Sequence, residues 1–307
     1  MKRLLFILQV ALFITMNFFL LLAVYELFQP AGVMGRPGVV EPRYNLVEEY
    51  DPSLKRLNNI DRLSAYVDSV YANETYTKKE IRFETDYPEV ANAIVRKRFF
   101  HGYSLYGFGN NAMAMFASKA SIGGLSAIVV PNDILKYPYA ACSQQSIVLM
   151  KLLQQKGFQT RKVAFLGKLG GHFCFEVYYN GAWHFIDTNM EPDMAVLNAY
   201  NRPGIDFLAA RPEILLKAYK HYPREKVLDL FTHYSYGKVN APAAPNAFVF
   251  QKVTKFLSYT IWTFFLVLFI LVRKRYLRLS YQPNVRNRRV HFPSLQPGTS
   301  QAFNVGY

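Results

Sequence analysis

The sequence predicts an α+β fold in which a buried helix packs on an antiparallel sheet, flanked by two transmembrane helices. Three features of the 307-residue chain predict it. Two long apolar segments lie near its ends, a helical segment that is apolar on every side follows Cys142, and strand patterns follow that segment. A helix that is apolar all round is a buried one. Asn180-Gly181, between the last two strand patterns, is a strong signal for a β-hairpin.

The two apolar segments are long enough to span a membrane, which takes about 20 apolar residues with a range of about 17–25. Residues 4–28 contain one acidic residue, Glu26, and residues 256–272 carry no charge. The second segment is near the lower limit, but Lys255 and Arg273 beside it can reach the membrane surface. The first is long for a signal peptide and lacks a clear cleavage motif, so we expect an uncleaved anchor, with a cleaved signal peptide as the alternative.

The charged residues are distributed unevenly along the chain. Every Asp and Glu lies between Glu26 and Asp229, whereas nine basic residues lie toward the chain ends from the two apolar segments: Lys2, Arg3, Arg273, Lys274, Arg275, Arg278, Arg286, Arg288 and Arg289. Cytoplasmic flanks of spanning helices are enriched in Lys and Arg. We therefore expect a two-pass protein of the inner (plasma) membrane, with both termini cytoplasmic and the middle of the chain periplasmic or extracellular. The net charge of +15 then reports topology, and we expect no nucleic-acid partner.

These patterns divide the chain into six segments. They are a transmembrane anchor (1–28), a Pro- and Gly-rich linker (29–60), an extracytoplasmic domain (61–235), a second linker (236–255), a second transmembrane helix (256–272) and a basic cytoplasmic tail (273–307). The last part of the tail shows no apolar periodicity, which is typical of disorder.

Within the domain, apolar spacing predicts the secondary structure in order. Helices are expected at 61–72, 87–100 and 111–120, and a short strand at 125–130. The clearest helix is 142–156, which Gly157 should end. Strands should follow at 160–166, 172–179 and 182–188, and then a helical stretch at 206–232 that is interrupted near Pro212 and Pro223.

Three residues with complementary chemistry lie at distinctive places in these elements. Cys142 opens the buried helix, His172 begins the second strand and Asp187 lies near the end of the third. With a two-residue turn at 180–181, paired residue numbers sum to 361, so Asp187 faces Cys174 and lies diagonal to His172, within side-chain reach. Alternation then divides the hairpin into a site face (His172, Cys174, Glu176, Asp187, Asn189) and a core face (Phe173, Phe175, Val177, Ile186).

Such a trio is suited to nucleophilic catalysis. The positive end of a helix favours the thiolate form of a cysteine placed there. An imidazole in reach takes the thiol proton and returns it to a leaving amine, and a carboxylate on the other ring nitrogen orients the imidazole. The backbone N–H of Cys142 is one candidate oxyanion donor. The second donor stays open among Asn110, Asn111, Tyr137 and Tyr139.

Residues 135–188 resemble the transglutaminase-like superfamily, a papain-related group. The resemblance is carried by Cys142 at the helix start, by Gly171-His172-Phe-Cys-Phe-Glu176-Val177 and by Trp183-His-Phe-Ile-Asp187. It implies a papain/transglutaminase-like core, with Cys142 as nucleophile, His172 as base and Asp187 as orienting acid. The chain departs from the family at Ala140, where a Gly is usual, and at Cys174, where an aromatic residue is frequent. Arylamine acetyltransferases share the residue order, but their Arg-Gly-Gly-x-Cys lead-in is missing.

Together these features predict a membrane-anchored thiol hydrolase or acyltransferase that acts on amide bonds outside the cytoplasm. The expected substrate is a peptide, a protein or an envelope polymer, with no cofactor, and with no metal because the other histidines lack ligand spacing. One alternative is a non-catalytic binding module for a peptide or envelope polymer. Another is a scaffold that contacts a membrane-protein partner through Gln9, Asn17 and Ser258.

Two further residues of the site face are open to a structural interpretation. Cys142 and Cys174 are the two cysteines of the chain, and in an oxidising compartment such a pair can form a disulfide. Glu176 is expected to be a structural salt-bridge partner rather than a second catalytic acid. The substrate, the choice between water and an amine as acceptor, and the oligomeric state stay open.

Overall fold

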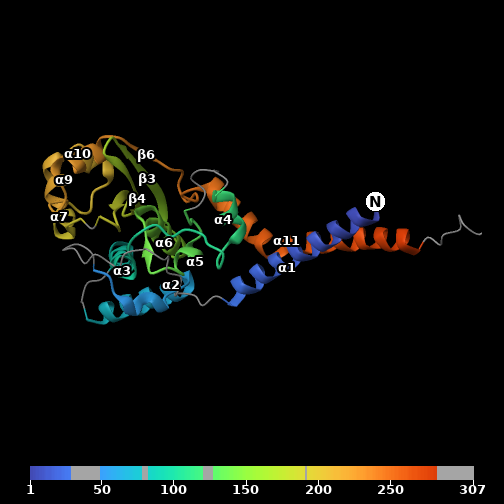
Figure 1. The fold of residues 1–307 in the computed structure, drawn as a ribbon. Coiled ribbons are helices and arrows are strands. Elements are labelled where there is room, and N and C mark those ends of the chain that lie inside the picture. Colours follow the sequence, from blue (N-terminus) through green and yellow to red (C-terminus); the bar gives the residue numbers. More distant parts are fainter. Residues whose placement is uncertain (29–48, 78–81, 120–126, 191, 282–307) are drawn as a thin grey trace, which may run out of the picture. The chain divides into compact units, whose positions relative to one another are not determined.

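A four-stranded antiparallel sheet organises the domain in the computed structural model, which describes residues 1–28, 49–77, 82–119, 127–190 and 192–281 (Figure 1). The strands are β3 (Gln159–Gly167), β4 (Gly170–Tyr179), β5 (Ala182–Ile186) and β6 (Tyr234–Tyr236), in the order β5-β4-β3-β6. The three predicted strands are confirmed. The edge strand β6 was not predicted, because its three residues adjoin a segment that reads as helix and linker.

The β4–β5 hairpin has the predicted register. Phe175 pairs with Ile186 and Glu176 with Phe185, so paired numbers sum to 361. The turn residues Asn180 and Gly181 have φ values of 48° and 78°. Two consecutive left-handed residues make the tight turn that matches the twist of a hairpin, which is why Asn-Gly predicts it.

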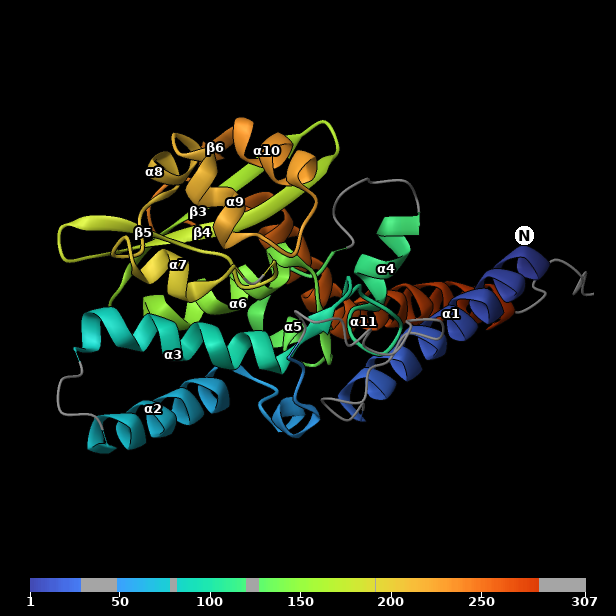
Figure 2. The ribbon, with the colours of Figure 1, turned by 90° about the vertical axis from the view of Figure 1, so that its left-hand side faces the viewer.

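One face of the sheet packs against α6 (Cys142–Gln155), with α2 (Ile60–Thr77) and α3 (Phe83–Arg98) beyond it (Figure 2). Phe175 and Val177 of β4 belong to the same buried cluster as Leu149 and Leu152 of α6. The predicted core face and the predicted buried helix are therefore confirmed. Gly157 follows the helix with φ +89°, as expected of a stop residue.

The opposite face carries a second core beneath four short helices. These are α7 (Met194–Asn198), α8 (Ile205–Ala209), α9 (Pro212–Ala218) and α10 (Arg224–Thr232). They pack on Val163, Phe165 and Phe185 of the sheet. The predicted stretch 206–232 is thus three helices, and the breaks fall at Pro212 and Pro223 because proline cannot donate a helical backbone hydrogen bond.

Several short elements precede Cys142 in the chain, between the first apolar helix and α6. They are a 3₁₀ turn at Pro52–Arg56, β1 (Phe100–His101), α4 (Ala112–Lys119), α5 (Pro131–Ile134) and β2 (Tyr139–Ala140), and β1 pairs with β2 in parallel. The helix expected at 87–100 ends at Arg98, and Phe100 is in a strand instead. Of the strand expected at 125–130, Ala127 forms an isolated bridge with Leu105, while 125 and 126 lie outside the described residues.

Arg98 is fully buried and holds the segment before β2 in place. Its guanidinium donates hydrogen bonds to the carbonyl oxygens of Leu57, Leu135 and Tyr137, at 3.2, 2.6 and 3.0 Å. Burial lowers the pKa of Arg98 to about 10, so it still carries its charge at neutral pH. Three carbonyl dipoles stabilise that charge and hold the segment that leads into β2.

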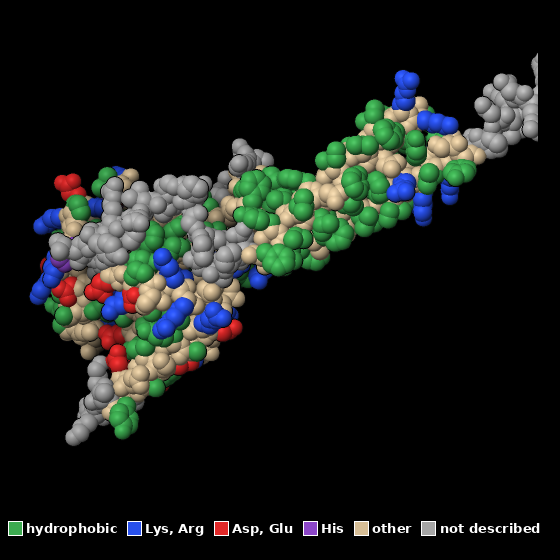
Figure 3. Space-filling view, turned by 60° about the horizontal axis from the view of Figure 1, so that its bottom comes forward, with side chains coloured by type: hydrophobic (Ala, Val, Ile, Leu, Met, Phe, Trp, Pro, Cys, Tyr) green, Lys and Arg blue, Asp and Glu red, His purple; other side chains and the backbone are tan. Residues whose placement is uncertain are grey.

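Two helices are long and apolar enough to cross a membrane: α1 (Lys2–Phe28) and α11 (Pro245–Tyr281). Figure 3 shows apolar side chains exposed along them, which excludes a soluble-core role for the second. These helices fit a two-pass membrane protein. Because α11 begins at Pro245, part of the expected linker 236–255 is helical, as is the start of the expected tail.

The described residues form two units, one made of residues 1–18 and 262–281 and the other of the described residues between 19 and 261. In the described part of the first unit, α1 and α11 touch through the ring pairs Phe6–Tyr276 and Phe13–Phe269, with centroids 6.3 and 5.8 Å apart. The predicted linker at 29–48 and the predicted tail at 282–307 lie outside the described residues.

Candidate active site

His172 and Asp187 form a buried pair at the point where β4 and β5 diverge. The Nε2 atom of His172 lies 2.8 Å from Oδ2 of Asp187, and the two residues are 7% and 2% exposed. Asp187 directly follows β5, so the predicted diagonal placement across the hairpin is confirmed. Because Nε2 faces the carboxylate, Nδ1 is the ring nitrogen that is left for a thiol.

The Asp187 carboxylate is held by three further donors. The Tyr219 hydroxyl donates to Oδ2 at 2.8 Å. The backbone N–H groups of Asn189 and Met190 donate to Oδ1 at 3.1 and 3.0 Å. A carboxylate with several donors stays ionised even when it is buried. The group is therefore fixed in position and in charge.

Burial and the attraction between opposite charges shift the pKa values of His172 and Asp187 in opposite directions, and the charge attraction is the stronger effect. Burial disfavours the charged form of both groups. For His172, the opposing effect of the Asp187 carboxylate, helped by hydrogen bonding, holds the pKa well above its ordinary value. For Asp187, His172 together with the donors from Met190 and Tyr219 lowers the pKa. The stable state of the pair is an imidazolium beside a carboxylate.

Cys142 is the first residue of α6 and is partly exposed. It lies close enough to His172 to help raise the pKa of the imidazole, after the larger effects of Asp187 and Cys174. The Ser146 hydroxyl, one turn into α6, donates to the carbonyl of Phe173 at 3.2 Å and so ties the helix start to the strand beside His172. The structure thus brings His172 and Asp187 into direct contact, and Cys142, at the helix start, lies near the imidazole.

Gln144 fixes the start of α6, a role that the sequence analysis did not assign to it. Its side chain is 1% exposed, and all four of its hydrogen bonds go to backbone groups. Oε1 accepts from the N–H groups of Ala141 and Ser104, and Nε2 donates to the carbonyls of Ser104 and Ile128, at 2.8–3.1 Å. A glutamine at the third helical position can close a capping box. That pattern is the signal that could have identified it.

Tyr219 and Tyr103 are further site residues that the sequence did not reveal. Tyr219 follows α9, and its distance along the chain from Asp187 leaves no local pattern. Burial, and then Asp187, hold its pKa well above the ordinary value, so it is a permanent hydrogen donor. Tyr103 is 56% exposed and close enough to Cys142 for the thiol to help raise its pKa, after burial.

The oxyanion candidates separate into occupied and available groups. The Asn111 amide donates to the Gln251 carbonyl and to the Thr254 hydroxyl of α11. Asn110 accepts from Lys136 and donates to Tyr137. Within the part of the chain that the structure describes, the backbone N–H of Cys142 donates to no protein acceptor. It is therefore the available donor at the helix start.

Cys174 lies beside the pair but is fully buried, and both cysteines are free thiols. Burial, followed by the charge of Asp187, raises its pKa well above the usual range. Such a thiol stays protonated and unreactive.

Glu176, on the same face of the hairpin, has the predicted structural role. Its Oε2 atom lies 2.6 Å from Nη2 of Arg161, and its Oε1 atom accepts from the N–H of Ile205 at the start of α8.

His172, Cys174 and Asp187 are also a possible ligand group for a metal, with one ligand atom each within 4.8 Å of the others. Zinc would take such ligands at about 2.0–2.3 Å. It would have to displace the hydrogen bond between His172 and Asp187, since Nε2 is already committed to that carboxylate. The donor set fits a hydrogen-bonded network better than a metal centre.

No protein-family model, no curated protein and no solved structure matches this chain significantly.

Proposed function

We propose that the protein is a membrane-anchored thiol hydrolase or acyltransferase that acts on amide bonds outside the cytoplasm. The observation that carries this proposal is the buried contact between His172 and Asp187, with Cys142 at the helix start close enough to influence the pKa of the imidazole. The same arrangement supports the proposed relationship to transglutaminase-like enzymes. The basic ends of the chain support the proposed orientation, with the domain in the periplasm or outside the cell.

The chemistry would proceed in two halves. Cys142 would react as the thiolate of a thiolate–imidazolium pair, with the thiol proton already on Nδ1 of His172, and the sulfur attacks the amide carbonyl carbon. The C–N bond then breaks, the leaving amine takes the proton from His172, and a thioester forms on Cys142. The backbone N–H of Cys142 would stabilise the negative oxygen between these steps.

The second half releases the acyl group. Water or an amine attacks the thioester carbon and gives a proton to His172, and the C–S bond breaks to restore the thiolate. Water yields a carboxylic acid, and an amine yields a new amide. Asp187 stays ionised throughout and stabilises the imidazolium. Tyr103 is positioned to contact the substrate beside Cys142.

The test is the acyl-enzyme on the full-length protein. The purified protein is incubated with a library of peptide amides and envelope fragments, quenched in acid and digested. We expect thioester adducts on the Cys142 peptide that hydroxylamine removes, and none in Cys142→Ala. In cells lacking the protein, Cys142→Ala should fail to complement at normal protein levels.

A binding module on the same fold is the second candidate. The observation in its favour is that Cys174 lies close to both His172 and Asp187. These buried contacts could keep His172 in place as a structural residue, with no catalytic role for Cys142. Full complementation by Cys142→Ala would establish it and would exclude the enzyme. The scaffold alternative loses one of its supports, because Ser258 is used within the chain, by Asn111 and Met113.

A further inference from the structure

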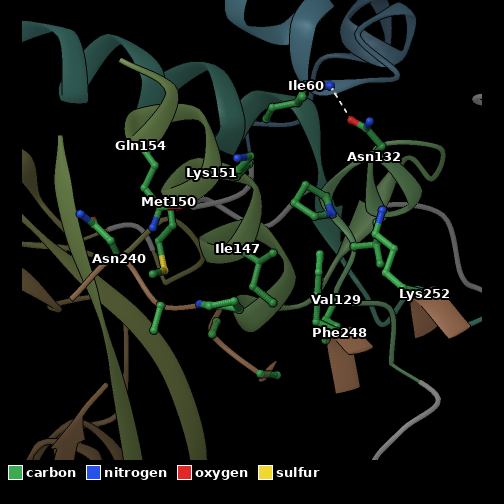
Figure 4. A pocket seen from close by; sticks show the side chains of 16 residues that line it. Ile60, Val129, Asn132, Ile147, Met150, Lys151, Gln154, Asn240, Phe248 and Lys252 are labelled. Carbon is green, nitrogen blue, oxygen red and sulfur yellow. Dashed lines mark hydrogen bonds between the residues drawn. The ribbon is translucent and has the colours of Figure 1, made fainter. Parts of the chain in front are cut away.

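A cavity of about 380 Å³ lies on the flank of α6, away from the candidate triad (Figure 4). Its walls are mainly apolar and come from five parts of the domain: the start of α2, α6, the segment around α5, the stretch before α11 and the first turns of α11. Figure 4 shows Ile147 and Met150 of α6 and, from other elements, Val129 and Phe248 among the lining side chains. A cavity of this size and character is suited to an apolar ligand group.

Two lysines are the charged residues of this cavity. Lys151 of α6 and Lys252 of α11 line it and are both exposed, so they lie at its mouth. Its lining contains no Asp or Glu. Among the described residues neither lysine forms an ion pair, and the recorded partner of Lys252 is the ring of Phe248 at 5.6 Å.

The polar amides of the lining are already engaged. The Asn132 side chain accepts from the N–H of Ile60, and the Gln154 side chain donates to Thr160. The charge of the lining is concentrated in the two ammonium groups. The cavity offers a positive mouth and an apolar interior.

The place of the cavity along α11 selects the kind of occupant. Lys252 lies about one helical turn before Phe256, where the uncharged run of α11 begins. Basic residues at this position of a spanning helix lie at the level of lipid headgroups. A soluble anion would use the lysines but would leave the apolar walls unfilled.

We propose that this cavity binds an anionic phospholipid, with an acyl chain against Ile147, Met150 and Phe248 and the phosphate at Lys151 and Lys252. The bound lipid would contact the helix whose first residue is Cys142. A lipid from the membrane surface would then be in direct contact with α6, the helix that carries the Cys142 thiol. This proposal does not depend on catalysis.

The test uses the full-length protein in nanodiscs of phosphatidylcholine that contain a small fraction of photoreactive phosphatidylglycerol. After irradiation, the labelled peptides are mapped by mass. We expect label on the peptides that contain Met150 and Phe248. In a K151Q/K252Q variant the amount of this label should fall about tenfold, as expected for the loss of two exposed charge contacts. The matched control K217Q/K226Q removes two exposed lysines elsewhere and should label like the wild type.

A second variant tests the interior rather than the mouth. Ala244→Trp fills the cavity while both lysines stay, and it should abolish the label on the Met150 peptide. Thermal unfolding of each variant establishes that it is folded. Equal labelling of K151Q/K252Q and its control would overturn the proposal. So would equal labelling by a photoreactive phosphatidylcholine, or label confined to the apolar runs of α1 and α11.

Discussion

At the scale of single residues, Asp187 controls the site. Its two oxygens receive the His172 imidazole, the Tyr219 hydroxyl and two backbone N–H groups. Because the carboxylate is buried, bulk water does not compete with these donors for its oxygens. Hydrogen bonds to a buried charge count for more than those at the surface. The charge state of His172 should therefore respond to each donor.

Tyr219→Phe tests this dependence. The variant removes one hydrogen bond to a buried carboxylate, so the free energy of unfolding should fall by about 1.5–3 kcal/mol. The carboxylate then becomes more basic, so the pKa of Asp187 should rise, and its stronger attraction for the imidazolium should also raise the pKa of His172. Denaturant unfolding and the imidazole NMR signals measure the two effects. Tyr200→Phe changes an exposed tyrosine and should alter neither; an unchanged His172 titration in Tyr219→Phe would contradict the account.

The pair also makes stability depend on pH. The pKa of His172 is raised on folding, so its contribution is complete below about 6.5 and is lost as pH rises through the raised value. The pKa of Asp187 is lowered, so its contribution is present above about 3.9 and is lost as pH falls through the lowered value. The stability lost in His172→Ala should therefore be greatest between about pH 4 and 6.5. A difference that stays flat from pH 4 to 10 would argue against the ion pair.

At the scale of elements, the start of α6 depends on loops that are also held by α11. Gln144 binds Ser104 and Ile128 from the α6 side. Gln251 of α11 accepts from the N–H of Val129 and donates to the carbonyl of Ala127. The same loops therefore lie between the nucleophile helix and the membrane helix, and their hydrogen bonds are shared between the two.

Gln144→Ala measures how much the Gln144 hydrogen bonds contribute to the stability of the domain. It removes four hydrogen bonds to backbone groups and leaves three of those groups (Ser104 N–H, Ala141 N–H and the Ile128 carbonyl) without this partner, so the free energy of unfolding should fall by about 2–4 kcal/mol. The start of α6 should loosen, so alkylation of Cys142 should lose its dependence on His172. Gln155→Ala, at the exposed end of the same helix, is the control and should cost less than about 0.5 kcal/mol. Similar stability of the two variants would show that Gln144 does not hold the helix start.

The strongest local patterns predicted the elements well. Asn180-Gly181 predicted the hairpin, its register and the diagonal placement of Asp187, because a two-residue turn leaves only one pairing. The apolar run after Cys142 predicted a buried helix. Tyr219 and Arg98 could not be predicted in the same way, because their partners lie far away in the sequence and their contacts depend on how helices pack on the sheet.

At the scale of the whole molecule, two apolar helices and the uneven charge predict topology. Membrane-impermeant maleimide tests it in intact cells, with Cys142 and Cys174 replaced by Ala. A Lys217→Cys residue in the domain should be labelled without permeabilisation. An Arg278→Cys residue, in the basic end of α11, should be labelled only after permeabilisation. The reverse pattern would place the domain in the cytoplasm.

The sequence was less informative about boundaries at this scale. Residues 256–272 predicted a spanning helix, but α11 begins at Pro245, because Gln251, Thr254 and Ser258 bind the domain and extend the helix into it. Such polar positions read as linker when their partners are unknown. The apolar run marks where a helix can meet lipid, while contacts with the domain decide where it starts.

The central claim is that Cys142 and His172 work as a pair, and the most direct measurement is thiol alkylation of the full-length protein against pH. Cys142 and Cys174 are followed separately by peptide mass, in the wild type and in His172→Ala. We predict that Cys142 is alkylated readily at pH 6, that this reactivity falls by about tenfold or more in His172→Ala, and that Cys174 stays unreactive in the folded protein. If Cys142 shows the same pH profile in both proteins, or reacts only after a reductant is added, the pair does not exist and the triad is a structural feature.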